Sequence, residues 1–206
     1  MSSNGSNGSN GTNGSNGTNG TSGIHAIVPE LLPDEHVLTA AATADIDLPE
    51  AALEALRTVG VPRLLRVIGW AGPALFQSDL AEGVLVSTAT PGALIERTGE
   101  HEGYILGSVR LGPKTPPYSV FVLLRTTGEV WLLDAGDPEM DRFVNVSLDA
   151  FLASMLAFHG AFDHLMVSSE DREKHVASFR EVLGKIDPRA LADDHNYWPG
   201  WIEEMG

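Results

Sequence analysis

The stretch YSVFVLLRTTGEVWLLD, residues 118–134, decides the fold of this 206-residue chain. It reads as two β-strands, 118–126 and 129–134, joined by a tight turn at Thr127-Gly128, because glycine accepts the positive φ that such a turn needs. Both faces of the first strand are apolar, with Val120, Val122 and Leu124 on one and Phe121 and Leu123 on the other. A strand that is apolar on both faces is typical of the centre of a sheet, so the hairpin is expected there rather than at an edge.

Further strands are expected before this hairpin, in short apolar runs that glycine and proline separate. These runs span residues 64–70, 83–87 and 103–109. The loop at 111–117 contains three prolines, which cannot donate a backbone hydrogen bond to a sheet. The loop is therefore expected to be exposed and to lie outside the strand ladder.

Helical patterns flank the strand cluster, and the first lies within residues 47–62. Asp47 followed by Glu50 fits a capping box, and Pro49 is tolerated in a first helical turn. Gly60 and Pro62 supply the stop signal. This segment is expected to form a helix of about three turns.

The C-terminal third returns to helical periodicity. Ser147 is expected to cap a helix that runs to about His159 and stops at Gly160, and a second helix is expected to start near Ser168 or Ser169. A final short segment, 196–205, carries several aromatic residues. The side chains expected to lie in the core are Leu148, Phe151, Leu152, Met155, Leu156, Val176, Phe179, Leu183, Ile186, Tyr197, Trp198, Trp201 and Ile202. The order of helix, strand cluster and helices predicts an α+β fold.

The N-terminal residues have a different composition from the rest of the chain. Residues 2–23 repeat Asn-Gly-Ser/Thr, a pattern with nothing to bury, so residues 1–23 are expected to be a disordered tail without chemistry. Residues 24–206 are of a suitable length for one domain.

Charge and cysteine content exclude several function classes. The chain has 28 acidic and 13 basic side chains, a formal net charge of −15, and no cysteine. Disulfides, thiolate nucleophiles and cysteine zinc sites are therefore excluded, and direct binding of nucleic acid or an anionic membrane is not expected. No apolar run of about 20 residues and no signal peptide is evident, so a soluble, cytoplasmic protein is expected.

Catalytic and metal-binding motifs are weak throughout. The loop DAGDPEMD, 134–141, collects Asp134, Asp137, Glu139 and Asp141, but Gly136 and Pro138 break the calcium-loop pattern, which favours a solvated acidic turn. No pair of histidines has metal-ligand spacing, and no nucleophile elbow or phosphate-binding glycine loop occurs. The sequence predicts neither an enzyme nor a bound metal or other cofactor.

Two motifs allow both a structural and a binding interpretation. Asn145 and Ser147 lie where a strand meets a helix, so they either satisfy helix N–H groups or contact a partner. Trp131 either packs in the sheet or anchors an interface.

The hairpin and the following helix resemble the signature of the SUKH superfamily of bacterial immunity proteins, most closely its fourth subfamily. There a G-x-V-x-x-L-D hairpin leads through a short variable loop into V-N-x-S-L-x-x-F-L, which opens a helix. The first helix, the strand YILGS and the closing YWPGWIEEM also match, so the resemblance covers about residues 45–205; Val146 departs from it, since the family often has serine there. The matching signature positions are Gly128, Val130, Leu133, Asp134, Val144, Asn145, Ser147, Leu148, Phe151 and Leu152.

The resemblance implies a fold, a function and a partner. The family fold is α+β, a mixed, largely antiparallel sheet flanked by helices, whose concave face binds a toxin. The implied function is non-catalytic: the protein binds and neutralises a cognate bacterial polymorphic toxin, often a nuclease or nucleic-acid deaminase. Two alternatives stay open, a scaffold or regulator of the same superfamily without a toxin partner and a hydrolase or metal-dependent enzyme.

The net charge suggests how such a toxin would be recognised. A toxin that acts on nucleic acid presents a cationic cleft, and an inhibitor with a charge of −15 would be steered toward it. The predicted partner contacts are Trp131, Asp134, Asp137, Glu139, Asp141 and Asn145, with a second acidic cluster at Glu96, Glu100 and Glu102.

Overall fold

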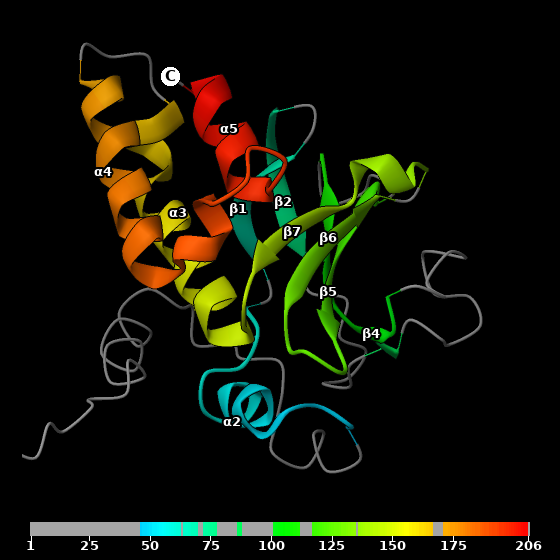
Figure 1. Ribbon diagram of the computed structural model, residues 1–206. Helices are drawn as coiled ribbons and strands as arrows, with labels where there is room; N and C mark the ends of the chain where they lie inside the picture. The colour runs from blue at the N-terminus through cyan, green and yellow to red at the C-terminus, as the bar shows by residue number, and fades with distance from the viewer. Residues whose placement is uncertain are drawn as a thin grey trace, which may run out of the picture.

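The computed structural model describes residues 46–62, 64–69, 72–77, 86–87, 101–111, 117–134, 136–166 and 171–205. Within these residues one antiparallel sheet packs against a layer of helices, and the first helix, α2, lies at one end of the sheet (Figure 1). Residues 1–45 fall outside the described part, so the division between tail and domain at residue 24 stays a prediction.

In the described part of the chain, the sheet contains seven strands. Their order is β1-β2-β4-β5-β6-β7, with β3 also paired to β4, and every described pairing is antiparallel. The strands are β1 (Leu64–Gly69), β2 (Gly72–Gln77), β3 (Val86–Ser87), β4 (Gly103–Arg110), β5 (Ser119–Leu124), β6 (Val130–Asp134) and β7 (Arg142–Asn145). β5 lies in the interior of this order, which confirms the central position expected from its two apolar faces.

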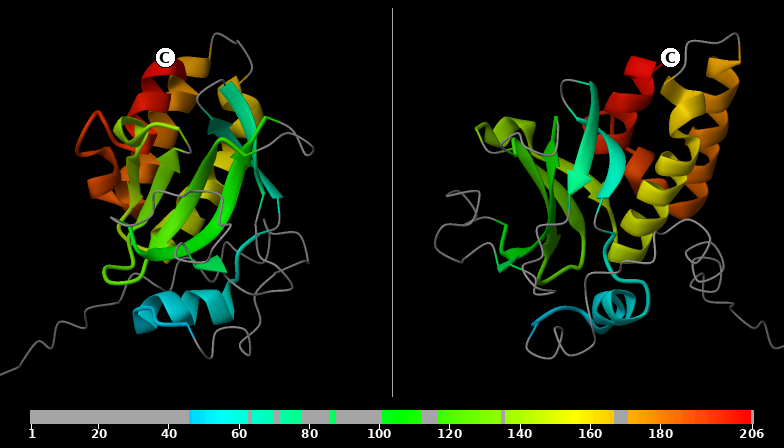
Figure 2. Two further views of the ribbon diagram at one scale, coloured as in Figure 1. Left: turned by 90° about the vertical axis from the view of Figure 1, so that its right-hand side faces the viewer. Right: turned by 180° about the vertical axis from the view of Figure 1, so that it is seen from behind.

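The helices lie mainly on one side of the sheet. Figure 2, left, shows the strands in front of the C-terminal helices, so one face of the sheet is turned toward that layer and the other away from it. The α-helices are α2 (Glu50–Thr58), α3 (Leu148–Met166), α4 (Arg172–Ile186) and α5 (Tyr197–Met205), and the short 3-10 helices are η4 (Pro138–Met140) and η5 (Pro188–Leu191). The α+β class is therefore confirmed.

The turn of the central hairpin forms for the expected reason. The backbone N–H of Gly128 donates to the Leu124 carbonyl at 3.0 Å, and the Leu124 N–H donates to the Glu129 carbonyl at 2.8 Å. Gly128 has a φ of +73°. This conformation is unfavourable for a residue with a Cβ atom but not for glycine. The turn thus spans residues 125–128 and brings Leu123 opposite Val130 in the ladder.

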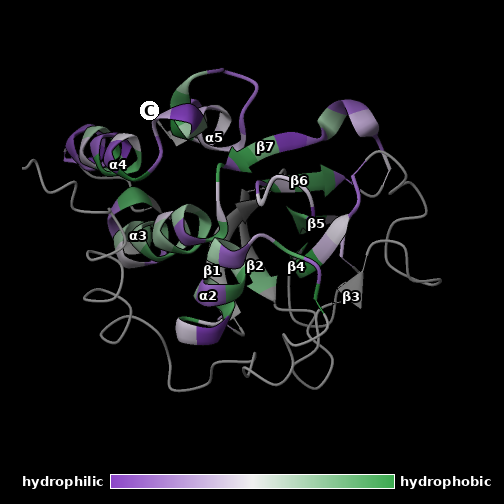
Figure 3. Ribbon diagram, turned by 60° about the horizontal axis from the view of Figure 1, so that its bottom comes forward, coloured by the Kyte–Doolittle hydropathy of each residue, from purple (hydrophilic) through white to green (hydrophobic). Residues whose placement is uncertain are grey.

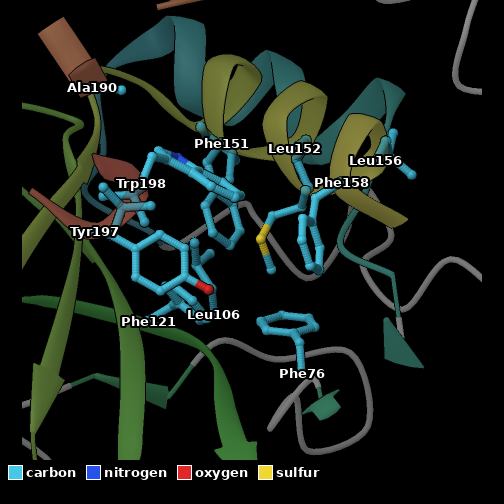
Figure 4. Close-up of a cluster of buried hydrophobic side chains, with 14 of the residues drawn as sticks. Phe76, Leu106, Phe121, Phe151, Leu152, Leu156, Phe158, Ala190, Tyr197 and Trp198 are labelled. Atoms are coloured by element: carbon cyan, nitrogen blue, oxygen red, sulfur yellow. The ribbon is translucent and has the colours of Figure 1, made fainter. Parts of the chain in front are cut away.

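An aromatic core joins the sheet to the helices. Phe76, Phe121 and Phe151 contact one another with centroid separations of 5.1–6.2 Å, and Tyr197 and Trp198 of α5 close the same cluster (Figure 4). Phe121 is fully buried, and burying such a side chain is worth about 1.5–3 kcal/mol. In Figure 3 the outer side of α4 is mainly hydrophilic, whereas the central strands are largely hydrophobic.

The predicted cap of α2 is wrong. Asp47 does not cap the helix, which begins at Glu50 and has Pro49 as its N-cap without a side-chain cap bond. The Asp47 carboxylate instead accepts a hydrogen bond from Arg125 at 2.7 Å, so a contact 78 residues away in sequence takes the group that the local pattern assigned to the cap. The end of the helix follows expectation, since Gly60 has a φ of +72° and its N–H donates to the Ala55 carbonyl.

The predicted stop at Gly160 is also wrong. Ser147 caps α3 as expected, because its Oγ accepts a hydrogen bond from the Ala150 N–H at 3.2 Å, but the helix continues to Met166. Glycine in a helix costs roughly 1 kcal/mol relative to alanine. The burial of Leu165 and the packing of Phe162 on Phe158, with centroids 5.6 Å apart, offset that cost.

Two strands were not among those expected. β2 begins Gly72-Pro73, residue types that argue against a strand, and pairs with β1 along its full length. β7 has only four residues and is held between β6 and the start of α3. α4 begins at Arg172, with Asp171 as its N-cap, whereas residues 83–85, 112–116 and 167–170 lie outside the described part.

Candidate partner-binding site

The sheet face turned away from α3 carries a second, smaller apolar cluster. Val120 and Val122 of β5 pack there with Ile105 of β4 and Leu133 of β6, and all four side chains are buried. Trp131 packs against this cluster but is only half-buried. A half-buried tryptophan beside an apolar cluster has the composition of an interface anchor.

Aromatic contacts fix the orientation of Trp131. His101, two residues before β4, stacks on the indole with centroids 5.2 Å apart and planes inclined by 30°. Phe143, its ladder partner on β7, meets it at 5.8 Å and 80°, an edge-to-face contact. Each such aromatic contact contributes about 0.5–1.5 kcal/mol beyond the area it buries, so Trp131 is held in place before any partner arrives.

Polar contacts close a ring around the same tryptophan. Trp131 Nε1 donates to Glu129 Oε2 at 3.4 Å, and the other oxygen of Glu129 pairs with Arg189 at 3.1 Å. The guanidinium carbon of Arg189 lies 5.1 Å from the centroid of the Phe143 ring. Four side chains from the central hairpin, β7 and η5 therefore contact one another in a closed circuit.

The acidic loop after β6 is an ordered turn rather than a free cluster of carboxylates. Asp134 Oδ1 accepts from the N–H groups of Gly136 and Asp137 at 2.8 and 3.0 Å. Asp141 Oδ1 accepts from the Asp134 N–H at 2.9 Å, and Asp137 caps η4 by accepting from the Glu139 N–H at 3.0 Å. Three of the four predicted contact carboxylates therefore have a structural role as well.

Glu139 differs from these three residues. It is exposed, and within the described residues its carboxylate makes no hydrogen bond or ion pair. Arg142, the nearest cation in sequence, donates to the main-chain carbonyls of Glu139 and Asp141 at 2.6 and 2.9 Å. Glu139 is consequently the member of the acidic turn whose charge is most available to a partner.

The second predicted acidic cluster is described only in part. Glu96 and Glu100 lie outside the described residues. Glu102 is exposed and shares Arg125 with Asp47, both at 2.7 Å, which ties the hairpin turn to the segment before α2. Hydrogen bonds to both carboxylates raise the pKa of Arg125, so this guanidinium stays charged.

Asn145 occupies the interior and cannot be a direct partner contact in this fold. It is 0% exposed; its amide Nδ2 donates to Ser154 Oγ at 3.2 Å and Asp187 Oδ2 at 3.1 Å, and its Oδ1 accepts from Trp198 Nε1 at 3.3 Å. The Val146 N–H donates to the same Asp187 oxygen at 2.8 Å. Asn145 therefore binds no helix N–H group, unlike Ser147, and instead links β7 to α3, α5 and the start of η5.

Three residues of the site were not expected from the sequence. His101, Phe143 and Arg189 reach Trp131 or its neighbours from separate parts of the chain, and Arg189 lies 60 residues from Glu129. Trp131 and Phe143 each alternate along their strand with buried core residues, which predicts that each points away from the core. That the two rings meet follows only from the pairing of β6 with β7, which the sequence did not reveal. The stacking of His164 on His175, with centroids 4.7 Å apart between α3 and α4, was also unexpected.

In the described part of the chain, no group of three or more histidine, aspartate or glutamate side chains could hold a metal ion. Among the described helices, none is both long and apolar enough to cross a membrane.

The antiparallel sheet and its helix layer define an α+β architecture, and His101 and Phe143 pack on Trp131 at the sheet face turned away from α3. A family model described as SUKH-4 immunity protein matches residues 31–204. The chain therefore belongs to the SUKH-4 immunity protein family, which confirms the resemblance found in the sequence. No curated protein and no solved structure matches it.

Proposed function

We propose that this chain is a non-catalytic immunity protein that binds and neutralises a cognate bacterial polymorphic toxin in the cytoplasm. The observation that carries the proposal is the family match over residues 31–204, which spans the sheet and the four described α-helices up to the last residue of α5. Immunity proteins of this family act by binding, so the activity would lie in a surface rather than in a catalytic centre.

The proposed toxin class is a nuclease or a nucleic-acid deaminase. Such an enzyme must present cationic groups to phosphates, and a partner with a net charge of −15 is complementary to it. The same charge would repel nucleic acid, so the immunity protein would engage the toxin and not its substrate.

The proposed contact surface combines Trp131 with the acidic turn 134–141. Trp131 would act as the buried anchor of the interface, since preorganised aromatic residues commonly dominate binding energy. Asp134, Asp137, Glu139 and Asp141 would supply the negative potential that speeds association, with Glu139 the most available of them. The anchor and the acidic turn would thus act on different rate constants, Trp131 on dissociation and the carboxylates on association.

The experiment that tests the function is capture of the toxin by the full-length protein. The bait is incubated with the product of the neighbouring toxin-like open reading frame in catalytically dead form. A one-to-one complex that also suppresses the active toxin's growth arrest is the expected result. No retained partner from a well-folded bait contradicts the proposal and favours the scaffold alternative.

Kinetics on that complex test the two proposed contacts separately. Glu139→Lys is expected to slow association about 2–5-fold at low salt and to weaken its salt dependence, because steering acts on the association rate. Trp131→Ala is expected to raise the dissociation rate by about 30-fold or more, the factor that corresponds to a loss of about 2 kcal/mol. Glu203→Lys makes the same charge change on an exposed α5 residue and is the matched control for Glu139. An equal effect of the two lysine substitutions would eliminate a specific role of the turn.

A further inference from the structure

The circuit around Trp131 has the chemistry of a cation-binding box. We define the box as the Glu129 carboxylate, the Trp131 indole edge and the Phe143 ring, with Arg189 as its present occupant. Carboxylate and aromatic face together are what bind guanidinium and ammonium groups in proteins, through charge-assisted hydrogen bonds and the ring quadrupole. Arg189 uses both, at 3.1 Å from Glu129 and 5.1 Å from the Phe143 centroid.

The walls of the box are more buried than its occupant. The Glu129 side chain is only 20% exposed and also accepts from Trp131 Nε1, while Phe143 is buried between Trp131 and Arg189. The Arg189 side chain, by contrast, is 64% exposed. A mostly exposed guanidinium against mostly buried walls describes a site that another cation can enter.

The main chain of Arg189 is held independently of its side chain. Its N–H donates to Asp187 Oδ1 at 3.1 Å, and its carbonyl accepts from Asn196 Nδ2 at 2.9 Å. The guanidinium can therefore leave the box without unravelling η5. Because the Arg189 side chain is largely exposed, water screens its ion pair with Glu129, so a partner can displace it at a small cost.

We propose that this box is a binding site for an arginine or lysine side chain of a protein partner, and that Arg189 is an internal stand-in which the partner's cation displaces. That the partner is the toxin rests on the proposed function; that the box accepts a guanidinium ion does not. Because Arg189 competes for the same site, its removal should raise affinity for a cationic ligand, whereas loss of the Glu129 charge should lower it.

Chemical complementation tests the box without any toxin. The full-length Arg189→Ala protein is titrated with ethylguanidinium, and the indole Nε1–H resonance of Trp131, assigned with a Trp131→Phe variant, reports occupancy. A saturable shift toward the resonance position of the unmodified protein is expected, with a dissociation constant on the order of 10 mM. The unmodified protein should respond about 5-fold more weakly, because Arg189 already fills its box.

Controls separate occupation of the box from non-specific effects. Ethylurea has the same shape without the charge, and Arg125→Ala removes an exposed arginine that pairs with Asp47 and Glu102 instead; neither should produce the shift. Arg189→Met is run in parallel, because it keeps an aliphatic stem over the Phe143 ring if the alanine variant folds poorly. A linear or absent response in both Arg189 variants, or a response that persists when Glu129→Gln is added, would overturn the proposal. Neither result would bear on toxin binding as such.

Discussion

Replacing Asn145 by alanine should destabilise the protein far more than an ordinary polar-to-alanine change. The substitution removes three hydrogen bonds from a residue that is 0% exposed. Trp198 Nε1 loses its acceptor, Ser154 Oγ loses a donor, and the buried Asp187 carboxylate keeps Val146 N–H and Arg189 N–H but loses the amide.

The magnitude follows from the charge and burial of the groups left behind. A hydrogen bond to a charged group is worth about 1.5–3 kcal/mol, and a buried donor left without an acceptor costs about 1–3 kcal/mol. The three bonds are 3.1–3.3 Å long, at the weak end of the normal range, so values near the lower limits apply. The expected loss is about 3–4 kcal/mol of unfolding free energy, a large part of the roughly 5–15 kcal/mol that folded domains possess.

Urea denaturation followed by tryptophan fluorescence measures this loss. With a typical m-value of about 2 kcal/mol/M, the midpoint should fall by about 1.5–2 M. Asn196→Ala is the matched control, because the Asn196 amide donates a single bond to the Arg189 carbonyl at an exposed site, and it should cost only about 0.5–1 kcal/mol. If the two variants lie within about 1 kcal/mol of each other, the network does not stabilise the fold as argued.

Three further predictions concern single positions. Gly160→Ala should stabilise the protein by about 1 kcal/mol in thermal or urea unfolding, because a Cβ there meets no atom within 4 Å and lies inside α3. Gly128→Ala should instead destabilise it by about 1–2 kcal/mol, because its φ of +73° strains any L side chain. Burial, together with the nearby Asp134, raises the pKa of Tyr118 to about 12, so the native state holds this proton more tightly than the unfolded chain does. The resulting stability is fully present below about pH 10 and is lost toward pH 12; Tyr118→Phe should remove that alkaline loss, and an unchanged pH profile would contradict it.

Features set by a few neighbouring residues could be predicted from the sequence. The turn at Gly128 and the cap at Ser147 depend on local conformational preferences, and both form as expected. The local patterns at Asp47 and Gly160 were equally clear, but both predictions are wrong. Asp47 pairs with the distant Arg125 instead of capping α2, and core packing continues α3 past Gly160. Local conformational preferences limit the structures that a segment can adopt, and tertiary contacts determine which of them forms.

The candidate site was less accessible to prediction than the fold. Trp131 could be identified by its residue type and its place in the hairpin, but its surroundings come from the pairing of β6 with β7 and from η5. The interior role of Asn145 was hidden for the same reason, since its partners Asp187 and Trp198 lie 42 and 53 residues away. Whether a polar residue at the end of a strand is buried depends on the helices that pack over it, and the local sequence does not show this.

The family signature separates fold-building positions from those that carry the candidate site. In the hairpin pattern G-x-V-x-x-L-D, the fixed positions Val130 and Leu133 are buried, whereas Glu129 and Trp131 occupy unspecified positions. Phe143 falls in the variable loop, immediately before the V-N-x-S-L segment whose Asn145 is wholly interior. Apart from Asp134, which is fixed and belongs to the acidic turn, the positions that the signature fixes can thus maintain one architecture, while unspecified positions outside the core, unlike the buried Leu132, change the surface presented to a partner. A binding protein that must match one partner and not others needs this division, because specificity requires the contact surface to vary without loss of stability.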